Sequence, residues 1–129
     1  MGAITNEGVI NGTGIGGLGT GYGIYNDRSA EMENIKNVGV ISGVGISSDD
    51  GEGYGIYNSS STMGAITNEG VISGAGISTG GNGEGYGIYN SAAMGNIENT
   101  GLISGTGYNN TSNGTSDTGS GIHNKSSDK

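Results

Sequence analysis

A repeat of 31 residues runs through the chain and limits its fold more than any other feature. Segments that begin at Met1, Met32, Met63 and Met94 share, with few departures, the frame Met-Gly-x-Ile-x-Asn-x-Gly-Val-Ile-Ser-Gly-x-Gly-Ile. After a loop, each segment continues with Gly-Tyr-Gly-Ile-Tyr-Asn or a variant of it. Helical repeats need stretches of ten or more residues with apolar spacing of three and four. Gly recurs every few residues here, so the repeat favours strands.

Three short strands per repeat are predicted from the β-branched runs that Gly and Asn bound. In the first repeat we expect them at residues 2–6, at 9–12 with an irregular extension to 15, and at 22–26. One repeat then makes one turn of a coil, and successive turns pair in parallel about 4.8 Å apart with identical residues stacked. The sequence therefore predicts an all-β fold, a parallel β-solenoid (β-helix) of four rungs. It forms a single domain over residues 1–129, with repeats at 1–31, 32–62, 63–93 and a degenerate last repeat, a candidate cap, at 94–129.

Composition alone points to a different conclusion. Ile, Leu and Val account for 22 of 129 residues and the formal net charge is −8, which places the aliphatic share below the roughly 20% under which an acidic chain is usually disordered. A narrow solenoid resolves this conflict, because it buries few side chains per rung and packs each against its own kind. The absence of Pro fits as well, since strands that donate to both neighbours need an N–H at almost every position.

Matched positions place Ile and Asn in columns. The strand period of two points the Ile of each Ile-x-Asn unit inward and the Asn inward at the following corner. An Asn amide can donate to one neighbouring rung and accept from the other; the alternative is that these Asn are only exposed turn formers. The Ile columns are Ile4, Ile35, Ile66, Ile97; Ile10, Ile41, Ile72, Ile103; and Ile24, Ile56, Ile88, Ile122. The two Asn ladders are Asn6, Asn37, Asn68, Asn99 and Asn26, Asn58, Asn90, Asn124.

Glycine and charge follow the same repeat. The column Gly8, Gly39, Gly70, Gly101 indicates bends that need a positive φ or a backbone with no side chain in the way. Identical charges in adjacent rungs would repel, and the column Glu7, Val38, Glu69, Thr100 avoids this. Most other acidic residues, Glu52 and Glu84 among them, fall in predicted loops.

Tyrosine forms two further columns. Tyr25, Tyr57 and Tyr89 follow an inward Ile and should face outward, continuing to His123 in the last repeat. Such an exposed stripe can bind sugars or a protein partner, or it can serve only as an aromatic ladder that stabilises neighbouring strands. Tyr22, Tyr54 and Tyr86 have inward parity, so we expect them to cover a corner of the coil.

The sequence contains no convincing catalytic or cofactor-binding motif, and we expect a non-enzymatic protein with no cofactor and no metal site. The run from Gly14 to Gly19 matches a dinucleotide-binding pattern that chance supplies in so Gly-rich a chain, and no predicted helix follows it. Asp49-Asp50-Gly51-Glu52 matches no known calcium loop and suits a solvated acidic loop. Glu7 and Glu69 would lie about 9.6 Å apart on one face, at the far edge of the spacing used by inverting glycosidases.

Charge also argues against nucleic acid and anionic membranes as partners. Four Lys and Arg stand against twelve Asp and Glu, and both kinds of partner need clustered positive charge. No apolar run approaches the roughly 18 residues of a membrane span. The first residues show neither the basic flank nor the apolar stretch of a secretion signal.

The residues Ile4-Thr5-Asn6-Glu7-Gly8-Val9-Ile10-Asn11-Gly12, followed by Gly23-Ile24-Tyr25-Asn26, resemble the passenger repeats of bacterial autotransporter-type adhesins and related large secreted surface proteins. The resemblance covers residue 1 to about residue 124. It implies a right-handed coil displayed outside the cell, commonly as a rigid stalk that carries adhesive modules. The chain departs from that family in showing no membrane barrel and no appended globular domain.

Two structural roles remain open from the sequence. The first is a rigid stalk or fibre segment of an extracellular, adhesin-like surface protein, whose partners are the adjoining rungs of a longer chain and a host or glycan surface. The second is a subunit whose partner is itself, stacked end to end into a filament. A carbohydrate-binding module that uses Tyr25, Tyr57 and Tyr89, and a polysaccharide-active enzyme, are weaker alternatives.

Overall fold

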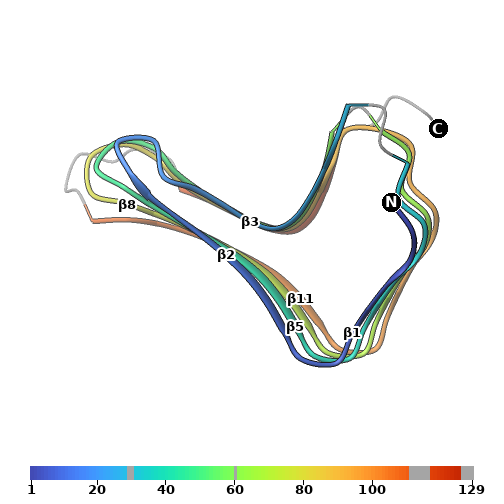
Figure 1. The fold of residues 1–129 in the computed structure, drawn as a ribbon. Coiled ribbons are helices and arrows are strands. Elements are labelled where there is room, and N and C mark those ends of the chain that lie inside the picture. The colour runs from blue at the N-terminus through green and yellow to red at the C-terminus, as the bar shows by residue number, and fades with distance from the viewer. Residues whose placement is uncertain (29–30, 60, 111–116, 126–129) are drawn as a thin grey trace.

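The computed structural model describes residues 1–28, 31–59, 61–110 and 117–125. Within them there is no helix, and the strands form three parallel four-stranded sheets that wind into a coil. The chain turns clockwise as it recedes from the viewer in Figure 1, so the coil is right-handed. The predicted β-solenoid, with three strands per rung, is confirmed.

The three sheets take one strand from each rung. Observed strands differ from the predicted ones mainly in length: the first is shorter, and the second and third reach eight residues in the first rung. The first sheet holds β1 (Ile4–Asn6), β4 (Ile35–Asn37), β7 (Ile66–Asn68) and β10 (Ile97–Asn99). The second holds β2 (Val9–Gly16), β5 (Val40–Ser47), β8 (Val71–Ser78) and β11 (Leu102–Asn109). The third holds β3 (Thr20–Asp27), β6 (Gly51–Ser59), β9 (Gly83–Asn90) and β12 (Thr118–Asn124).

Strand register follows the repeat, with like residues opposite one another. In the first sheet Ile4 pairs with Ile35, 31 residues on. In the third sheet Tyr22 pairs with Tyr54, 32 residues on. The extra residue lies between Ser47 and Glu52, which are separated by four residues where the paired Gly16 and Thr20 are separated by three. The stretch before Met63 is one residue shorter in compensation. The third sheet therefore stays in step with the other two.

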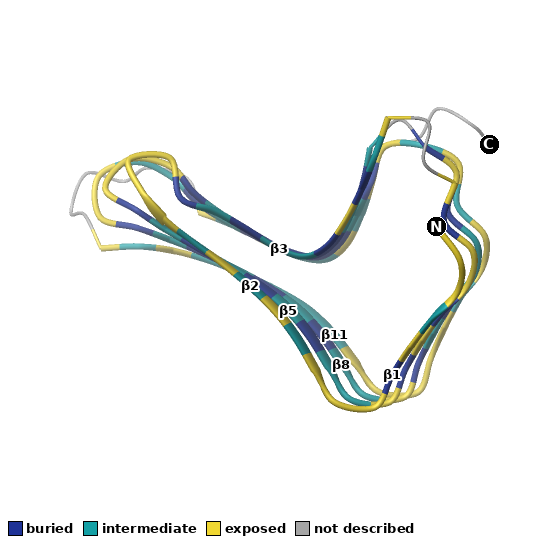
Figure 2. Ribbon diagram, in the orientation of Figure 1, coloured by how far each residue is buried: buried dark blue, intermediate teal, exposed yellow. Residues whose placement is uncertain are grey.

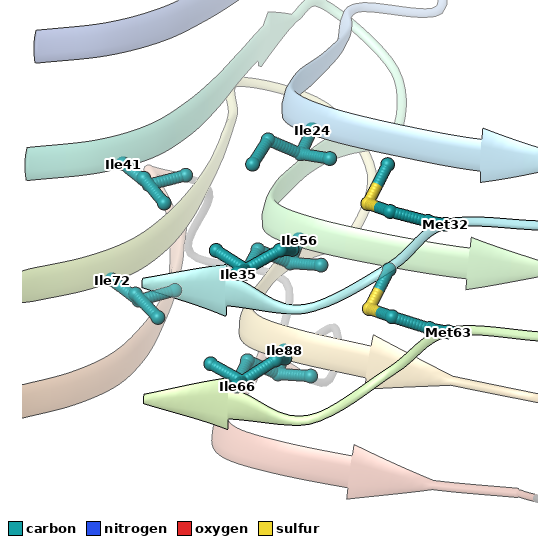
Figure 3. Close-up of a cluster of buried hydrophobic side chains, with 9 residues drawn as sticks. All are labelled: Ile24, Met32, Ile35, Ile41, Ile56, Met63, Ile66, Ile72 and Ile88. Carbon is teal, nitrogen blue, oxygen red and sulfur yellow. The ribbon is translucent and has the colours of Figure 1, made fainter. Parts of the chain in front are cut away.

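The core lies in the wide part of the coil, where the first sheet meets the start of the second sheet and the end of the third (Figures 1 and 3). Its middle rungs are fully enclosed. Buried residues recur at matched places along each turn (Figure 2). The cluster of buried hydrophobic residues is Ile24, Met32, Ile35, Ile41, Ile56, Met63, Ile66, Ile72 and Ile88.

The predicted Ile columns occupy this core, with their outer members less enclosed. Ile4, Ile10, Ile97 and Ile103 are half-buried and pack against the cluster. Ile122 pairs in register with Ile88, and 48% of its surface is exposed in the last rung. Met32 and Met63 form a further core column, paired in parallel with Met94.

A narrow arm extends from the wide part, and, apart from the buried Ser47 and Ser78 at its tip, glycines face one another between its two strands. The arm comprises residues 12–23, 43–55 and 74–87, where β2, β5 and β8 run against β3, β6 and β9 (Figure 1). A Cβ added at Gly43 would overlap the carbonyl oxygen of Tyr54, and one at Gly45 would overlap that of Glu52. The two strands therefore pack backbone against backbone, which only Gly permits.

The Gly8 column is explained by close packing and not by an unusual φ. Among the described residues, positive φ occurs only at Gly16 and at Arg28, where φ is 50°. A Cβ on Gly39 or Gly70 would overlap the carbonyl oxygen of the matching glycine one rung earlier. Of the two explanations offered by the sequence, the absence of room for a side chain is the one that holds.

The expected separation of like charges fails in the third sheet. Glu52 and Glu84 lie in β6 and β9 rather than in loops, and they pair directly in register. The predicted third strand began at the first tyrosine of each repeat, whereas β6 and β9 begin three residues earlier and so include the glutamates. Each carboxylate instead accepts a hydrogen bond from a tyrosine hydroxyl.

Candidate functional site

The first Asn ladder runs along the corner between the first and second sheets. Asn6 Nδ2 donates to Asn37 Oδ1 at 2.8 Å, and the same bond links Asn37 to Asn68 and Asn68 to Asn99 at 2.7 Å. Each Nδ2 also donates to carbonyl oxygens: that of Asn37 reaches Gly39 at 3.1 Å and Val71 at 3.0 Å. The ladder thus joins consecutive rungs and satisfies the turn that follows each short strand.

The second Asn ladder runs along the end of the third sheet. Asn26 donates to Asn58 and Asn58 to Asn90, both at 2.7 Å, and Asn90 donates to Asn124 at 2.9 Å. Asn58 is fully buried, as are Asn37 and Asn68 in the first ladder. The alternative of exposed turn formers is wrong for these positions.

A tyrosine double ladder lies on the outer side of the third sheet. Tyr22, Tyr54 and Tyr86 stack with ring centroids 5.2 and 5.3 Å apart. Beside them stack Tyr25, Tyr57 and Tyr89, at 5.3 and 4.9 Å, and His123 continues this row at 5.2 Å from Tyr89. The two rows touch in every rung that contains both tyrosines.

The inward parity expected for Tyr22, Tyr54 and Tyr86 is wrong. Pairing in the third sheet passes from Tyr22↔Tyr54 to Ile24↔Ile56, with an interruption at Gly23. The third-sheet strands bend sharply midway in Figure 1. The bend breaks the alternation of faces, so Tyr22 and Tyr25 come to the same side with centroids 4.7 Å apart. Tyr54 and Tyr86 are each only 6% exposed, because other tyrosines cover them.

Carboxylates hold three of the tyrosine hydroxyls. Tyr54 Oη donates to Glu52 at 3.1 Å, Tyr86 Oη to Glu84 at 3.0 Å, and Tyr25 Oη to Asp27 at 3.2 Å. Burial and then the hydrogen bond to Glu84 raise the pKa of Tyr86 to about 12. Burial, followed by the charge of Glu52, raises the pKa of Tyr54. These phenols therefore remain protonated donors throughout the neutral range.

The outer row has its ring edges, more than its ring faces, directed to solvent. Tyr57 and Tyr89 stack nearly parallel, with 2° between their planes, so each covers a face of the other. Sugar recognition by aromatic residues uses a free ring face. The geometry thus favours the aromatic-ladder interpretation of Tyr25, Tyr57 and Tyr89, and the binding stripe remains a hypothesis.

The outer face of the second sheet is uncharged and largely apolar. It carries a column of Ile that points away from the core: Ile15 is 77% exposed, while Ile46 and Ile77 are half-buried. A shallow hollow of about 330 Å³ lies at the end of this column. Its lining residues are Ile15, Gly16, Ile46, Ser47, Ser48 and Thr79.

Sequence motifs that suggested chemistry have structural roles where the chain is described. Glu69, one member of the candidate acid pair, forms an ion pair with Lys36 at 3.4 Å. Asp50 caps the backbone N–H of Asn82 at 2.8 Å. The Gly14–Gly19 motif spans the end of β2 and a turn. The described residues contain no group of three or more His, Cys, Asp or Glu placed to hold a metal.

No helix suited to crossing a membrane occurs in the described ranges. No family model, no curated protein and no solved structure matches the chain.

Proposed function

We propose that the chain is a non-catalytic structural element, a rigid β-solenoid stalk or fibre segment of an extracellular bacterial surface protein. The observation that carries the proposal is the continuity of the two Asn ladders, which tie each rung to the next through amide bonds of 2.7–2.9 Å that are buried except at the last rung. Such buried networks, when every member is satisfied, rigidify a structure.

Load along the coil axis would be shared by many parallel bonds. The second rung, formed by β4, β5 and β6, is joined to the third by three strand pairs and by two side-chain amide bonds. Separating two rungs requires these bonds to break together, since the sheets enclose one core. This arrangement suits an element that transmits force or holds other modules at a distance.

The resemblance of the Ile-x-Asn-x-Gly frame to passenger repeats supports the extracellular part of the proposal. An antibody raised against the chain would test it on intact and lysed cells of the source bacterium. Staining of intact cells, lost after protease treatment of their surface, is expected. Antigen that becomes accessible only on lysis would contradict the location.

Mechanical strength provides the test of the stalk role. The chain would be pulled between flanking marker domains in a single-molecule force experiment, with a variant carrying Asn58→Val as the comparison. We expect a resolved unfolding event in the native chain and a lower force in the variant. Extension without any event, like that of a flexible linker, would contradict the proposal.

End-to-end assembly is a second candidate because the ladders have a direction. In every described step the Nδ2 of one Asn donates to the Oδ1 of the Asn one rung later. Asn99 could therefore donate to Asn6 of a second copy stacked in the same sense. Electron microscopy of the purified chain would show uniform filaments with an axial repeat of about 19 Å, four strand separations. Uniformly single particles at high concentration would contradict assembly.

A further inference from the structure

Six of the seven tyrosines gather in the double ladder, and the proposed structural role does not use their phenol chemistry. Within each rung the two rings are close and inclined to each other. The centroids of Tyr22 and Tyr25 are 4.7 Å apart with 57° between the planes, and those of Tyr54 and Tyr57 are 4.8 Å apart with 80°. Directly bonded rings lie only slightly closer.

Inclined pairs are better placed to join than parallel ones. A bond between two phenol rings links a carbon at the edge of one ring to a carbon at the edge of the other. The stacked rings of Tyr57 and Tyr89, with 2° between their planes, present faces instead of edges. Inclined contacts also occur between rungs, but their centroids are 5.3 and 5.6 Å apart, against 4.7 and 4.8 Å within the first and second rungs. These within-rung pairs are therefore the natural coupling partners.

Each of these two pairs also contains a phenol that is hydrogen-bonded to a carboxylate. Tyr25 donates to Asp27 at 3.2 Å, and Tyr54 donates to Glu52 at 3.1 Å. A phenol that loses an electron must release its proton, and a positioned carboxylate can receive it. Tyr25 is 47% exposed, so a reagent in solution can reach the ladder directly.

We propose that the double ladder is a site of oxidative modification, at which a peroxidase-type oxidant with hydrogen peroxide joins Tyr22 to Tyr25 and Tyr54 to Tyr57 as dityrosine. Each phenol gives one electron to the oxidant and its hydroxyl proton to the carboxylate or to water. The two radicals form a carbon–carbon bond at the positions adjacent to the hydroxyl-bearing carbons. Two carbon–hydrogen bonds then break, the hydrogens leave as protons, and both hydroxyls are restored. Hydrogen peroxide takes up the two electrons and two protons and becomes two waters.

Such a bond would fasten the bend of the third sheet. Tyr22 and Tyr25 lie on either side of Gly23, where the strand pairing is interrupted. A covalent link across this point fixes the angle between the arm and the wide part of the rung. The inference does not depend on the cellular location or on the stalk role.

The test uses the full chain treated with a peroxidase and hydrogen peroxide. We expect dityrosine fluorescence, a mass loss of two hydrogens per bond, and fragmentation that is blocked between residues 22 and 25 and between 54 and 57. Tyr25→Phe combined with Tyr57→Phe keeps the stacked rings but should lose most of the signal. Tyr108→Phe is the matched control, because Tyr108 is 53% exposed and lies outside the double ladder; it should keep the signal.

The role of Glu52 as the proton acceptor for Tyr54 gives a second test. Glu52→Gln should slow formation of the Tyr54–Tyr57 bond by about tenfold or more, while the Tyr22–Tyr25 bond in the same molecule and the variant Glu69→Gln serve as controls. The chain unfolded in urea should give a lower yield of both bonds. Equal yields in the folded and unfolded chain, modification confined to Tyr108, or bonds only between molecules would overturn the proposal.

Discussion

In the wide part of each rung, Ile and Met side chains fill the space between the strands, whereas along the glycine-lined stretch of the arm two strands meet backbone to backbone. Both parts come from one repeat. The wide part draws its stability from apolar burial and from the Asn ladders. The arm depends on a distance of approach that a single methyl group would prevent. A core of few side chains can thus close a long turn, provided that part of the turn needs no core.

The largest difference between the two parts is expected from a side chain placed in the arm. The Cβ of Gly74→Val would overlap the carbonyl oxygens of Tyr86 and Gly53. We expect the free energy of unfolding to fall by more than about 4 kcal/mol, or folding to be lost. The neighbouring change Ala75→Val points outward, where Val44 pairs with it in register, and should alter stability by less than about 0.5 kcal/mol. Urea denaturation measures both, and similar midpoints would refute side-chain exclusion from the arm.

The next largest effect is expected from the ladders of the wide part. Asn68→Val removes the donor to the Asn99 side chain and to the Leu102 carbonyl oxygen, and it leaves the Nδ2 of the fully buried Asn37 without its acceptor in the next rung. Stability should fall by about 3 kcal/mol. Thr67→Val in the same strand is the control, since Thr67 is only half-buried and belongs to neither ladder. Equal losses for the two variants would show that the amide bonds add little.

Alkaline pH provides a reversible test of the tyrosine double ladder beside the arm. The pKa of Tyr22 and of Tyr86 is raised to about 12, first by burial, while an unfolded tyrosine has a pKa near 10. The stability gained from the neutral phenols is therefore complete below about pH 10 and is lost as the pH rises toward 12. Urea midpoints measured across this range should fall, and Tyr86→Phe should flatten the decline. A decline unchanged by Tyr86→Phe but removed by Tyr108→Phe would contradict this assignment.

The smallest effect is expected from trimming the core itself. Ile72 is fully buried, and Ile72→Val should cost about 1 kcal/mol. Ile77→Val, in the same strand but on the outer face, should cost less. Calorimetry would resolve the two variants. A loss at Ile72 as large as that of Gly74→Val would mean that the wide part is as intolerant as the arm.

Stacking was the part of this fold that the sequence could predict. Identical residues at a fixed spacing pair with one another, so Ile35 opposite Ile66 and Asn37 beside Asn68 follow from the repeat. The Met column was missed because its residues lie outside the regular strands, paired only by isolated bridges.

The side of the sheet to which a residue points could be predicted only where the strand is straight. Alternation of side chains assigned Tyr25 correctly but placed Tyr22 inward, because nothing in the residue pattern marks Gly23 as a bend. The arm was likewise hidden. Alternating Gly can mean flexibility or close approach, and only the opposing strand decides between them.

The common direction of the amide bonds makes each Asn ladder a column of aligned dipoles. Every NH₂ group points toward later rungs and every carbonyl oxygen toward earlier ones, in both ladders. Hydrogen bonds in such a row polarise one another, so the dipoles reinforce along the axis. Both ladders therefore run as parallel rows of dipoles along the coil axis, with the positive end of every amide directed toward the last rung.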